Sequence, residues 1–351
     1  MAKSIRELAW NVPEETYRDN NILSYSILSK YLSDGFENLD HLFDKEDSQA
    51  LRFGSMVDCL VFDGQEEFDK KYLVCVIQDT TDDFKKVCAK IYEEIGSMCP
   101  LLDSLPDKGI VEYLDLFGIY QNTNWKVETK ASKFRESASA YYLMLHSAEG
   151  RTIVNKDTYD EVVACVNAVK NNPATEWYFR KDNQFDGIER IYQLKLKGEY
   201  SNIPIRCMID LLIIDHKNKR IIPCDLKTSS DPEFKFPSAF LKWHYFIQAG
   251  LYTYLIKKTI ENDDYFKDFK VEDFRFIVVS KANKTPLVWV WDKASTVGDI
   301  NIYTQTNRTV VIKDWRDILV ELNGYLKYRP AFPNNIVENV PNDIFGAILE
   351  W

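Results

Sequence analysis

The sequence lacks any run of about 18–20 apolar residues, the length that a membrane-spanning helix needs. The segment from Met1 to Trp10 also lacks the apolar core of a secretion signal. We therefore expect a protein that has no membrane partner and resides in the cytoplasm.

Cysteine is sparse and shows no pairing pattern. The seven cysteines are an odd number and include no Cys-x-x-Cys motif, which argues against a disulfide framework, a zinc ribbon and an iron–sulfur cluster. Internal repeats and low-complexity tracts are absent as well. We interpret the thiols as reduced and mostly buried, including Cys207 and Cys224, which flank the candidate site described below.

The composition that remains is that of a large folded domain. A chain of 351 residues with 45% hydrophobic and 14% aromatic residues can bury an extensive core. The net charge of −10 counts against a nucleic-acid substrate unless cations gather in one groove. The basic stretch 125–135, Lys281 and Lys284 could contact phosphates, although we favour a solvated surface for each.

Hydrophobic periodicity predicts a mixture of helices and strands. Helices are expected at about 25–32, 51–62, 156–171, 238–259 and 314–328, and strands at about 72–77, 189–196, 203–215, 220–227, 274–280 and 287–291. Strands surrounding one long helix indicate an α/β core. We expect residues 1–150 to form a mainly helical region whose helix at about 51–62 contributes to the site. Residues 151–351 would form the core, with both parts in one compact unit.

The most informative short motif is Asp225-Leu226-Lys227, at the end of the apolar run 220–224. Side chains alternate between the two faces of a strand, so Asp225 and Lys227 share one face and Leu226 takes the other. A carboxylate that can hold a divalent cation beside an ammonium that can orient a water is a minimal pair for phosphodiester hydrolysis. Such triplets are common in a chain with 28% charged residues, and most are solvated strand edges or helix faces.

The preceding sequence supplies a second carboxylate. The apolar run 203–215 is joined to the motif by the polar turn 216–219, and a hairpin symmetric about that turn places Asp210 opposite Asp225. Directly opposed side chains have Cβ atoms about 4.5–5.5 Å apart, so the two carboxylates repel each other unless a cation or a shared proton relieves them. Oxygen ligands favour Mg²⁺ or Mn²⁺ over zinc. The alternative is a pair of aspartates at an exposed hairpin end, which the apolar neighbours of Asp210 disfavour.

The expected helix at 238–259 carries Gln248 and Tyr252, four residues apart and therefore on one helical face. An amide and a phenol there could hydrogen-bond a phosphate or hold an active-site group. By itself the pair is weak evidence, because Gln and Tyr at this spacing are commonplace.

In this order the motifs resemble those of the PD-(D/E)XK nuclease superfamily, specifically its RecB-like branch and the RecE-type phage and prophage exodeoxyribonucleases. That branch has a strand Glu, a Gly-x-x-Asp strand, a (D/E)-x-K strand and a Gln-x-x-x-Tyr helix. The matching residues here are Glu189, Asp210, Asp225 with Lys227, and Gln248 with Tyr252. With the segments 53–58 and 151–157, the similarity spans roughly residues 22–260.

The resemblance implies a restriction-endonuclease-like core, in which helices flank a central mixed β-sheet, together with a helical N-terminal region. It also implies residue roles. Asp58, Asp210, Asp225 and the backbone carbonyl of Leu226 would bind one or two Mg²⁺ or Mn²⁺ ions, Lys227 would orient or activate the attacking water, Gln248 and Tyr252 would support the site, and Glu189 would stand at its edge.

The family further implies a biological setting. Its members resect the ends of linear double-stranded DNA in the 5′ to 3′ direction, often as ring-shaped homo-oligomers that work with a single-strand annealing protein in phage-type DNA recombination. The corresponding location is the cytoplasm of a bacterium or of a phage-infected host.

Two residues depart from the family pattern. Asp58 stands where the family usually has the His of Gly-x-x-x-His, and Cys207 stands where the strand motif usually has Gly. A carboxylate at 58 can still ligate Mg²⁺ through oxygen, whereas Cys207 could narrow the approach of DNA. Two alternatives therefore stay open: a related endonuclease of the restriction or repair type, and a degenerate nuclease fold used for DNA binding.

Overall fold

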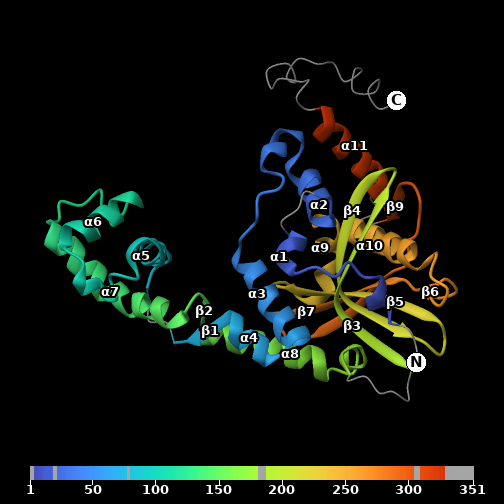
Figure 1. Cartoon of the computed structure of the whole chain (residues 1–351), viewed down its shortest axis with the longest axis horizontal. Coiled ribbons are helices and arrows are strands. Elements are labelled where there is room, and N and C mark those ends of the chain that lie inside the picture. The colour runs from blue at the N-terminus through green and yellow to red at the C-terminus, as the bar shows by residue number, and fades with distance from the viewer. Residues whose placement is uncertain (1–3, 19–21, 77–79, 181–186, 304–308, 329–351) are drawn as a thin grey trace. The chain divides into compact units, whose positions relative to one another are not determined.

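The structure, a computed structural model, describes residues 4–18, 22–76, 80–180, 187–303 and 309–328 (Figure 1). The chain divides into two compact units, the first formed by Met1–Gly54 with Asn167–Trp351 and the second by Ser55–Val166. The sequence analysis expected a single compact unit, in which a mainly helical region ends and the core begins near residue 150, so this division differs from that expectation. The physical reason is that the N-terminal helix α2 (Tyr25–Asp34) packs on α10 (Tyr245–Ile260) and α11 (Trp315–Tyr328), which lie in the second half of the chain.

A mixed β-sheet of six strands forms the centre of the first unit, in the order β3-β4-β5-β7-β8 with β6 beside β5. Its strands are β3 (Ile188–Tyr200), β4 (Ile203–Asp215), β5 (Arg220–Ser229), β6 (Lys270–Val271), β7 (Phe274–Ser280) and β8 (Pro286–Trp291). Neighbouring strands are antiparallel, except that β5 runs parallel to β6 and to β7. The expected fold class, an α/β arrangement with helices flanking a central mixed sheet, is confirmed.

The register of the β4–β5 hairpin is the one expected from the symmetric turn. The ladder runs from Asp215 opposite Arg220 to Leu211 opposite Cys224. Asp210 and Asp225 come directly after this last pair. The hairpin therefore brings the two aspartates to the same end of the ladder.

The β3–β4 ladder is irregular beside Asp210. Leu212 and Ile209 of β4 both belong to the main core, although strict alternation would place residues three apart on opposite faces. Within the described ladder the pair Gln193–Asp210 is missing, and Gln193 has a φ of 50°. A residue in this left-handed conformation turns the strand locally, and the register is the same on both sides of it, so no residue is inserted. Asp210 therefore stands at a break in the alternation.

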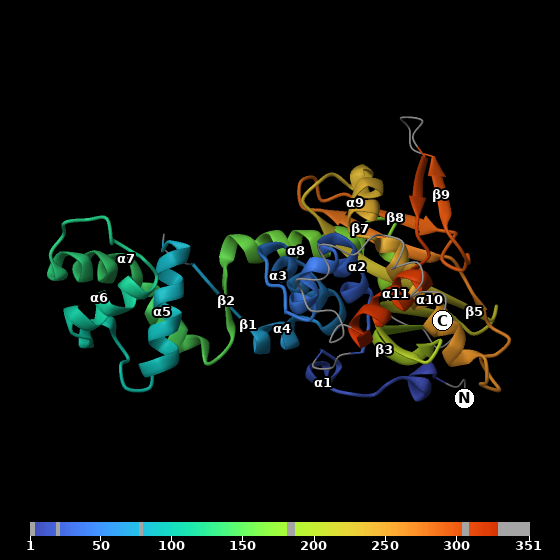
Figure 2. The same ribbon diagram turned by 90° about the horizontal axis from the view of Figure 1, so that it is seen from above.

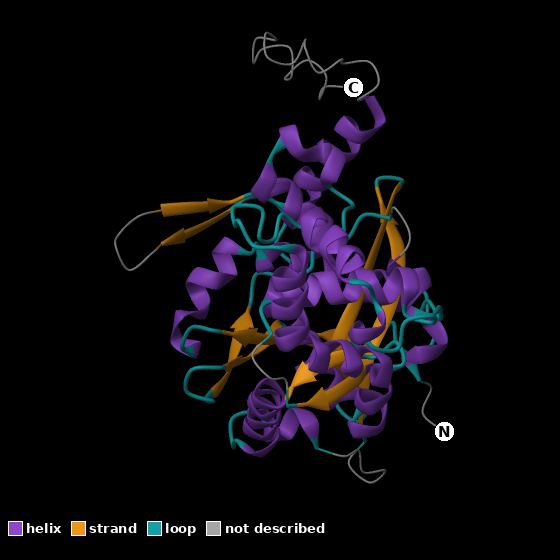
Figure 3. Ribbon diagram, turned by 90° about the vertical axis from the view of Figure 1, so that its left-hand side faces the viewer, coloured by secondary structure: helices purple, strands orange, loops and turns teal. Residues whose placement is uncertain are grey.

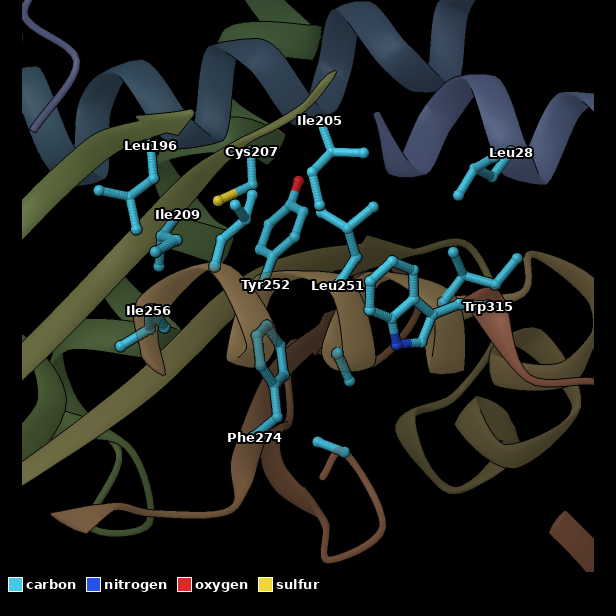
Figure 4. Close-up of a cluster of buried hydrophobic side chains, with 14 of the residues drawn as sticks. Leu28, Leu196, Ile205, Cys207, Ile209, Leu251, Tyr252, Ile256, Phe274 and Trp315 are labelled. Atoms are coloured by element: carbon cyan, nitrogen blue, oxygen red, sulfur yellow. The ribbon is translucent and has the colours of Figure 1, made fainter. Parts of the chain in front are cut away.

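Helices of the first unit cover the sheet. They are α1 (Glu14–Arg18), α2 (Tyr25–Asp34), α9 (Phe236–Lys242), α10 (Tyr245–Ile260) and α11 (Trp315–Tyr328), while α3 (Gln49–Asp58) and α8 (Lys156–Asn171) each cross from one unit into the other. The expected helix starts at Tyr25 and Lys156 are confirmed, the first with Ser24 at the cap position. Figure 4 shows Leu251, Tyr252 and Ile256 of α10 in the same apolar cluster as Cys207 and Ile209 of β4.

The prediction of a single helix at 238–259 is wrong in one respect, because the helix is interrupted between α9 and α10. His244 adopts a left-handed conformation with φ 53°. The carbonyl oxygen of Trp243 instead accepts hydrogen bonds from the hydroxyls of Tyr25 (2.7 Å) and Ser29 (3.0 Å) of α2. The break sets the direction of α10 independently of α9, which matters for Gln248.

Two strands that the sequence did not suggest form a separate hairpin, β9 (Ile300–Tyr303) with β10 (Thr309–Ile312). Figure 3 shows this hairpin standing apart from the central sheet. Short helical turns complete the unit at Ile5–Leu8, Phe36–His41, Glu176–Phe179 and Glu233–Lys235.

The second unit is mainly helical and has its own core. Its elements are the π-helical turn Cys59–Asp63, α4 (Gln65–Lys71), β1 (Tyr72–Cys75), α5 (Asp82–Ile95), the turn Leu102–Ser104, α6 (Asp107–Leu116), α7 (Val127–Ala148) and β2 (Thr152–Asn155). Both α5 and α6 pack on α7 (Figure 2), and β1 pairs in parallel with β2. Within the basic stretch 125–135, Arg135 binds Asp107 at 2.6 Å and so supports this fold. Among the described residues, no helix is both long enough and apolar enough to cross a bilayer.

Candidate active site

Asp225 and Lys227 form a buried ion pair near the end of β5. The Asp225 Oδ2 to Lys227 Nζ distance is 2.7 Å, and the side chain of Asp225 is only 3% exposed. The ammonium also lies 4.7 Å from the centre of the Tyr245 ring, at the start of α10. The strand places both charges on one face, as the alternation of side chains predicts.

The charges around Lys227 keep it protonated. Burial by itself lowers the pKa of the ammonium, but the negative charge of Asp225 and the neighbouring groups of Tyr245, Tyr25 and Asp210 outweigh burial and raise the pKa above its usual value. In this state Lys227 donates hydrogen bonds and carries positive charge. It can orient a water or stabilise an anion, whereas accepting a proton requires the Asp225 charge to be compensated first.

Asp210 completes the end of the hairpin. Its Oδ2 accepts a hydrogen bond from the backbone N–H of Leu226 at 2.9 Å. This side-chain bond follows the last backbone pair, so Asp210 continues the ladder through its carboxylate. Asp210, Asp225 and Leu226 are thereby held next to one another by the β4–β5 hairpin.

Gln248 reaches the same place from α10. Its Nε2 donates to Asp225 Oδ1 at 2.5 Å, and the residue is 3% exposed. One buried oxygen, Gln248 Oε1, has no hydrogen-bond partner among the described residues, while Asp225 Oδ2 contacts the Lys227 ammonium. A buried acceptor is normally satisfied, so the amide oxygen can accept a further hydrogen bond at this place.

The donor set fits a hard divalent ion. Among the described residues no group of three or more His, Cys, Asp and Glu side chains forms a ligand cluster. Mg²⁺ does not require one, because it usually keeps several waters and binds one or two carboxylates together with substrate phosphates. Asp210, Asp225 and the carbonyl oxygen of Leu226 supply oxygen ligands of this type.

Tyr252 lies one turn after Gln248 and is buried among apolar side chains, 8% exposed (Figure 4). Burial raises the pKa of its hydroxyl well above the usual value, with further contributions from Tyr17, Cys207, Asp225 and Asp210. The phenol therefore stays neutral beside the carboxylates. Its supporting role in the site stays a prediction.

Tyr25 and Tyr245 are neighbours of Lys227 that the sequence analysis missed. Their rings lie 6.2 Å apart, and Lys227 lowers the pKa of both hydroxyls although burial, the largest effect, raises it overall. Tyr245 stands three residues before Gln248 and so on the same helical face, which is a signal that could have identified it. No comparable signal exists for Tyr25, which belongs to a distant helix.

Glu189 does not join the cluster. In the register of the sheet it stands opposite Ile214, four residues along β4 from Asp210, or roughly 13 Å away along the strand. Its carboxylate accepts a hydrogen bond from Ser4 (2.8 Å) and contacts His216 Nε2 (3.2 Å). The expectation that Glu189 stands at the edge of the site is corrected, because its partners hold it near the turn of the hairpin.

Two further residues from the sequence analysis have different standings. Asp58 is the last residue of α3 and belongs to the second unit, so its role as a ligand stays a prediction. Cys207 is fully buried in the core, and burial raises the pKa of its thiol far above the usual value. Cys207 is therefore an unreactive packing residue.

Comparison with known proteins gives little guidance. No protein-family model matches the chain, and no curated protein matches it either. Among solved structures, a crystal structure of an Eubacterium rectale protein described as a candidate exonuclease aligns over 94% of both chains, with 12% sequence identity and a TM-score of 0.42. A likeness at this level assigns no family.

Proposed function

We propose that this protein is a metal-dependent nuclease that hydrolyses phosphodiester bonds in double-stranded DNA. The observation that carries the proposal is the buried cluster of Asp225, Lys227, Asp210 and Gln248, in which two carboxylates, a cation and an amide oxygen without a partner meet at one end of a hairpin. Burying charged groups costs free energy unless they are paired or bind a ligand such as a metal ion. On these physical grounds the cluster is a candidate functional site.

Asp210, Asp225 and the Leu226 carbonyl would hold Mg²⁺ or Mn²⁺, with Asp58 as an additional ligand predicted from the family resemblance. When bound, such an ion polarises the scissile phosphate and lowers the pKa of the attacking water. Gln248 fixes the orientation of the Asp225 carboxylate through its hydrogen bond. Lys227, held protonated, orients the water and offsets negative charge that develops on the phosphate.

The finer assignment is to the RecE-type exonucleases of the PD-(D/E)XK superfamily. The order of motifs in the sequence and the placement of Asp210, Lys227 and Gln248 support it. The 5′ to 3′ direction, a ring-shaped homo-oligomer, an annealing-protein partner and a cytoplasmic location follow from that resemblance alone and stay predictions.

Activity on linear duplex DNA tests the proposal. Wild-type protein with Mg²⁺ should degrade the DNA, and removal of the ion with EDTA should abolish degradation. Asp225→Asn and Lys227→Met should each reduce the rate by at least about a hundredfold, because Asp225 would hold the metal ion and Lys227 would act on the water and the phosphate. Glu189→Gln is a matched control outside the cluster and should retain the rate.

The pattern of products separates the alternatives. An exonuclease leaves covalently closed circular DNA intact, whereas an endonuclease cuts it. A wild-type rate no faster than that of Asp225→Asn and Lys227→Met, with DNA binding retained, would instead favour a degenerate fold that only binds DNA.

The role of Asp58 needs a separate test. Asp58→Asn should weaken Mg²⁺-dependent activity at limiting Mg²⁺ and recover in part at high Mg²⁺. Asp63→Asn, which removes a carboxylate that pairs with Lys71 at 3.2 Å, serves as the control. Full activity of Asp58→Asn at every Mg²⁺ concentration would remove Asp58 from the metal site.

A further inference from the structure

We infer that Arg206, together with Lys195 and Lys197, forms a phosphate-binding strip that holds the backbone of the nucleic-acid strand leading to Asp210. The inference rests on the proposed function and adds residues that the family motifs do not include. Its starting point is a charged side chain of which two guanidinium nitrogens have no hydrogen-bond partner among the described residues.

Arg206 of β4 is only 6% exposed, and within the described ranges of the chain its Nε and Nη1 have no hydrogen-bond partner. The guanidinium lies 4.7 Å from the centre of the Tyr17 ring, and Arg206 forms no ion pair with the described residues. Arg190 of β3 is also buried, but its guanidinium has hydrogen-bond partners. Its guanidinium donates to the carbonyl oxygens of Tyr178 (3.0 Å) and Trp177 (2.6 Å).

A buried arginine without an anionic partner is unfavourable for folding, because the charge loses its hydration and gains no compensating carboxylate. Stacking on an aromatic ring offsets only part of that cost. A phosphate would satisfy both the charge and the planar set of N–H donors, since guanidinium geometry matches two phosphate oxygens at once. Arg206 is therefore preorganised for an anion.

Two lysines of β3, together with Arg206, form a strip of positive charge. The β3–β4 register places Lys197 opposite Arg206, and directly opposed side chains share a face of the sheet. Lys197 is exposed and lies 5.3 Å from the centre of the Trp10 ring, while Lys195 is half-buried and donates to the carbonyl oxygen of Val12 at 2.7 Å. Neither lysine pairs with a carboxylate among the described residues.

The composition of the strip is unusual for this chain. Three cations without ion pairs lie together in a protein whose net charge is −10. Aromatic rings of the segment before and within α1 accompany two of them, Trp10 with Lys197 and Tyr17 with Arg206. Cations interleaved with aromatic side chains are typical of surfaces that follow a nucleic-acid backbone.

The strip includes a residue of the strand that carries Asp210. Arg206 stands four residues before Asp210 on the same strand, a spacing of roughly 13 Å along β4. Tyr17 is a neighbour of both residues: burial is the main reason that the pKa of its hydroxyl is raised, while the charge of Arg206 lowers this pKa and that of Asp210 raises it. A phosphate on Arg206 would thus belong to the bound strand but not to the scissile position.

Binding of duplex DNA in EDTA, where no cleavage occurs, tests the inference with a readout other than activity. Arg206→Met should weaken binding by roughly tenfold or more and reduce the slope of log affinity against log salt by about 0.7–0.9. Lys197→Met should reduce the slope by a similar amount with a smaller loss of affinity. Lys327→Met is the matched control, because Lys327 is also exposed, forms no ion pair with the described carboxylates and lies 5.4 Å from an aromatic ring, that of Tyr328.

Thermal unfolding separates a binding role from a structural one. Arg206→Met should unfold at or above the wild-type temperature, because it removes an unpaired buried charge, whereas Arg190→Met should unfold at a lower temperature because it loses hydrogen bonds. Unchanged DNA affinity and salt slope in Arg206→Met, or a variant that no longer folds, would overturn the inference while leaving the proposed nuclease intact. Wild-type protein that fails to bind DNA at all would overturn both.

Discussion

At the scale of single residues, Asp225 and Lys227 depend on each other. Asp225 is 2% exposed, so its charge is tolerable only beside the ammonium 2.7 Å away and the amide of Gln248. The same arrangement raises the pKa of Lys227 and keeps it charged. The groups proposed for the chemistry are thus also a point at which the fold is vulnerable.

Replacing Lys227 with Met exposes this dependence. The Asp225 charge is left buried without its partner, and losing one member of a buried pair typically lowers the free energy of unfolding by about 3–5 kcal/mol. Asp225→Asn should have a comparable effect, whereas the double variant removes both charges and should recover much of the loss. Urea unfolding of all four proteins measures the coupling, and additive losses would show that the pair is not coupled.

Asp215 should make the hairpin turn sensitive to acid. Its carboxylate accepts hydrogen bonds from Asn218 N (2.9 Å), Asn218 Nδ2 (2.8 Å) and Arg220 Nη2 (2.7 Å). Burial is the largest single effect and raises its pKa, but the hydrogen bonds and charge of its partners together lower the pKa below its usual value. Because the folded pKa lies below the unfolded one of about 3.9, the stabilisation is present above pH 4 and is lost as the pH falls through that range.

Asp215→Ala should therefore lower the free energy of unfolding at pH 7 by about 1–3 kcal/mol and flatten its decline between pH 5 and pH 3. Asp268→Ala, which removes an exposed partner of Lys219, should leave both unchanged. Unfolding by urea at several pH values measures the two curves. Parallel declines in wild type and Asp215→Ala would exclude this carboxylate as the acid-sensitive group.

At the scale of elements, the direction of α10 decides whether a site forms. The helix begins after the left-handed residue His244, and Tyr25 and Ser29 of α2 bind the carbonyl freed by the break. From there α10 runs beneath the sheet and delivers Gln248 to Asp225. Its other side packs on α11, where Gly250 meets Trp315.

Gly250→Ala tests that packing. A Cβ at Gly250 would lie 2.5 Å from Trp315 Cδ1, so the helices must separate, at an expected cost of about 1–3 kcal/mol in the free energy of unfolding. Gly324→Ala is the matched control in α11, because a Cβ there meets no atom within 4 Å and should stabilise the helix by roughly 0.5–1 kcal/mol. Denaturant titration measures both. Effects of the same sign would contradict the close approach of α10 and α11.

At the scale of the whole molecule, each of the two units contains a buried apolar cluster of its own. The sheet unit centres on residues such as Phe274, and the helical unit on residues such as Phe134, both fully buried. Because each unit has its own core, each can unfold cooperatively by itself. A single free energy of unfolding need not describe the chain.

Calorimetry should resolve two transitions. Phe134→Ala should lower the midpoint of one and Phe274→Ala that of the other, because each substitution removes about 3–5 kcal/mol from one core. The unaffected transition is the internal control in each variant. A single transition shifted equally by both substitutions would show that the two units unfold together.

The sequence by itself determined the features that depend on neighbouring residues. Alternation of apolar residues and the polar turn 216–219 predicted the hairpin and its register, which the pairing of Leu211 with Cys224 confirms. The spacing of apolar residues predicted α8 and β7 with their observed bounds. These patterns are local, because strand and helix periods act over a few residues.

Only the tertiary structure decided which of those residues meet. The broken helix before α10, the irregular rung at Gln193 and the removal of Glu189 from the cluster all follow from contacts with distant elements. The unpaired state of Arg206 is likewise invisible in the sequence, because it depends on what surrounds the side chain in space. Sequence periods fix faces and registers, but the free energy of burying a charge is set by partners that the chain brings together only when it folds.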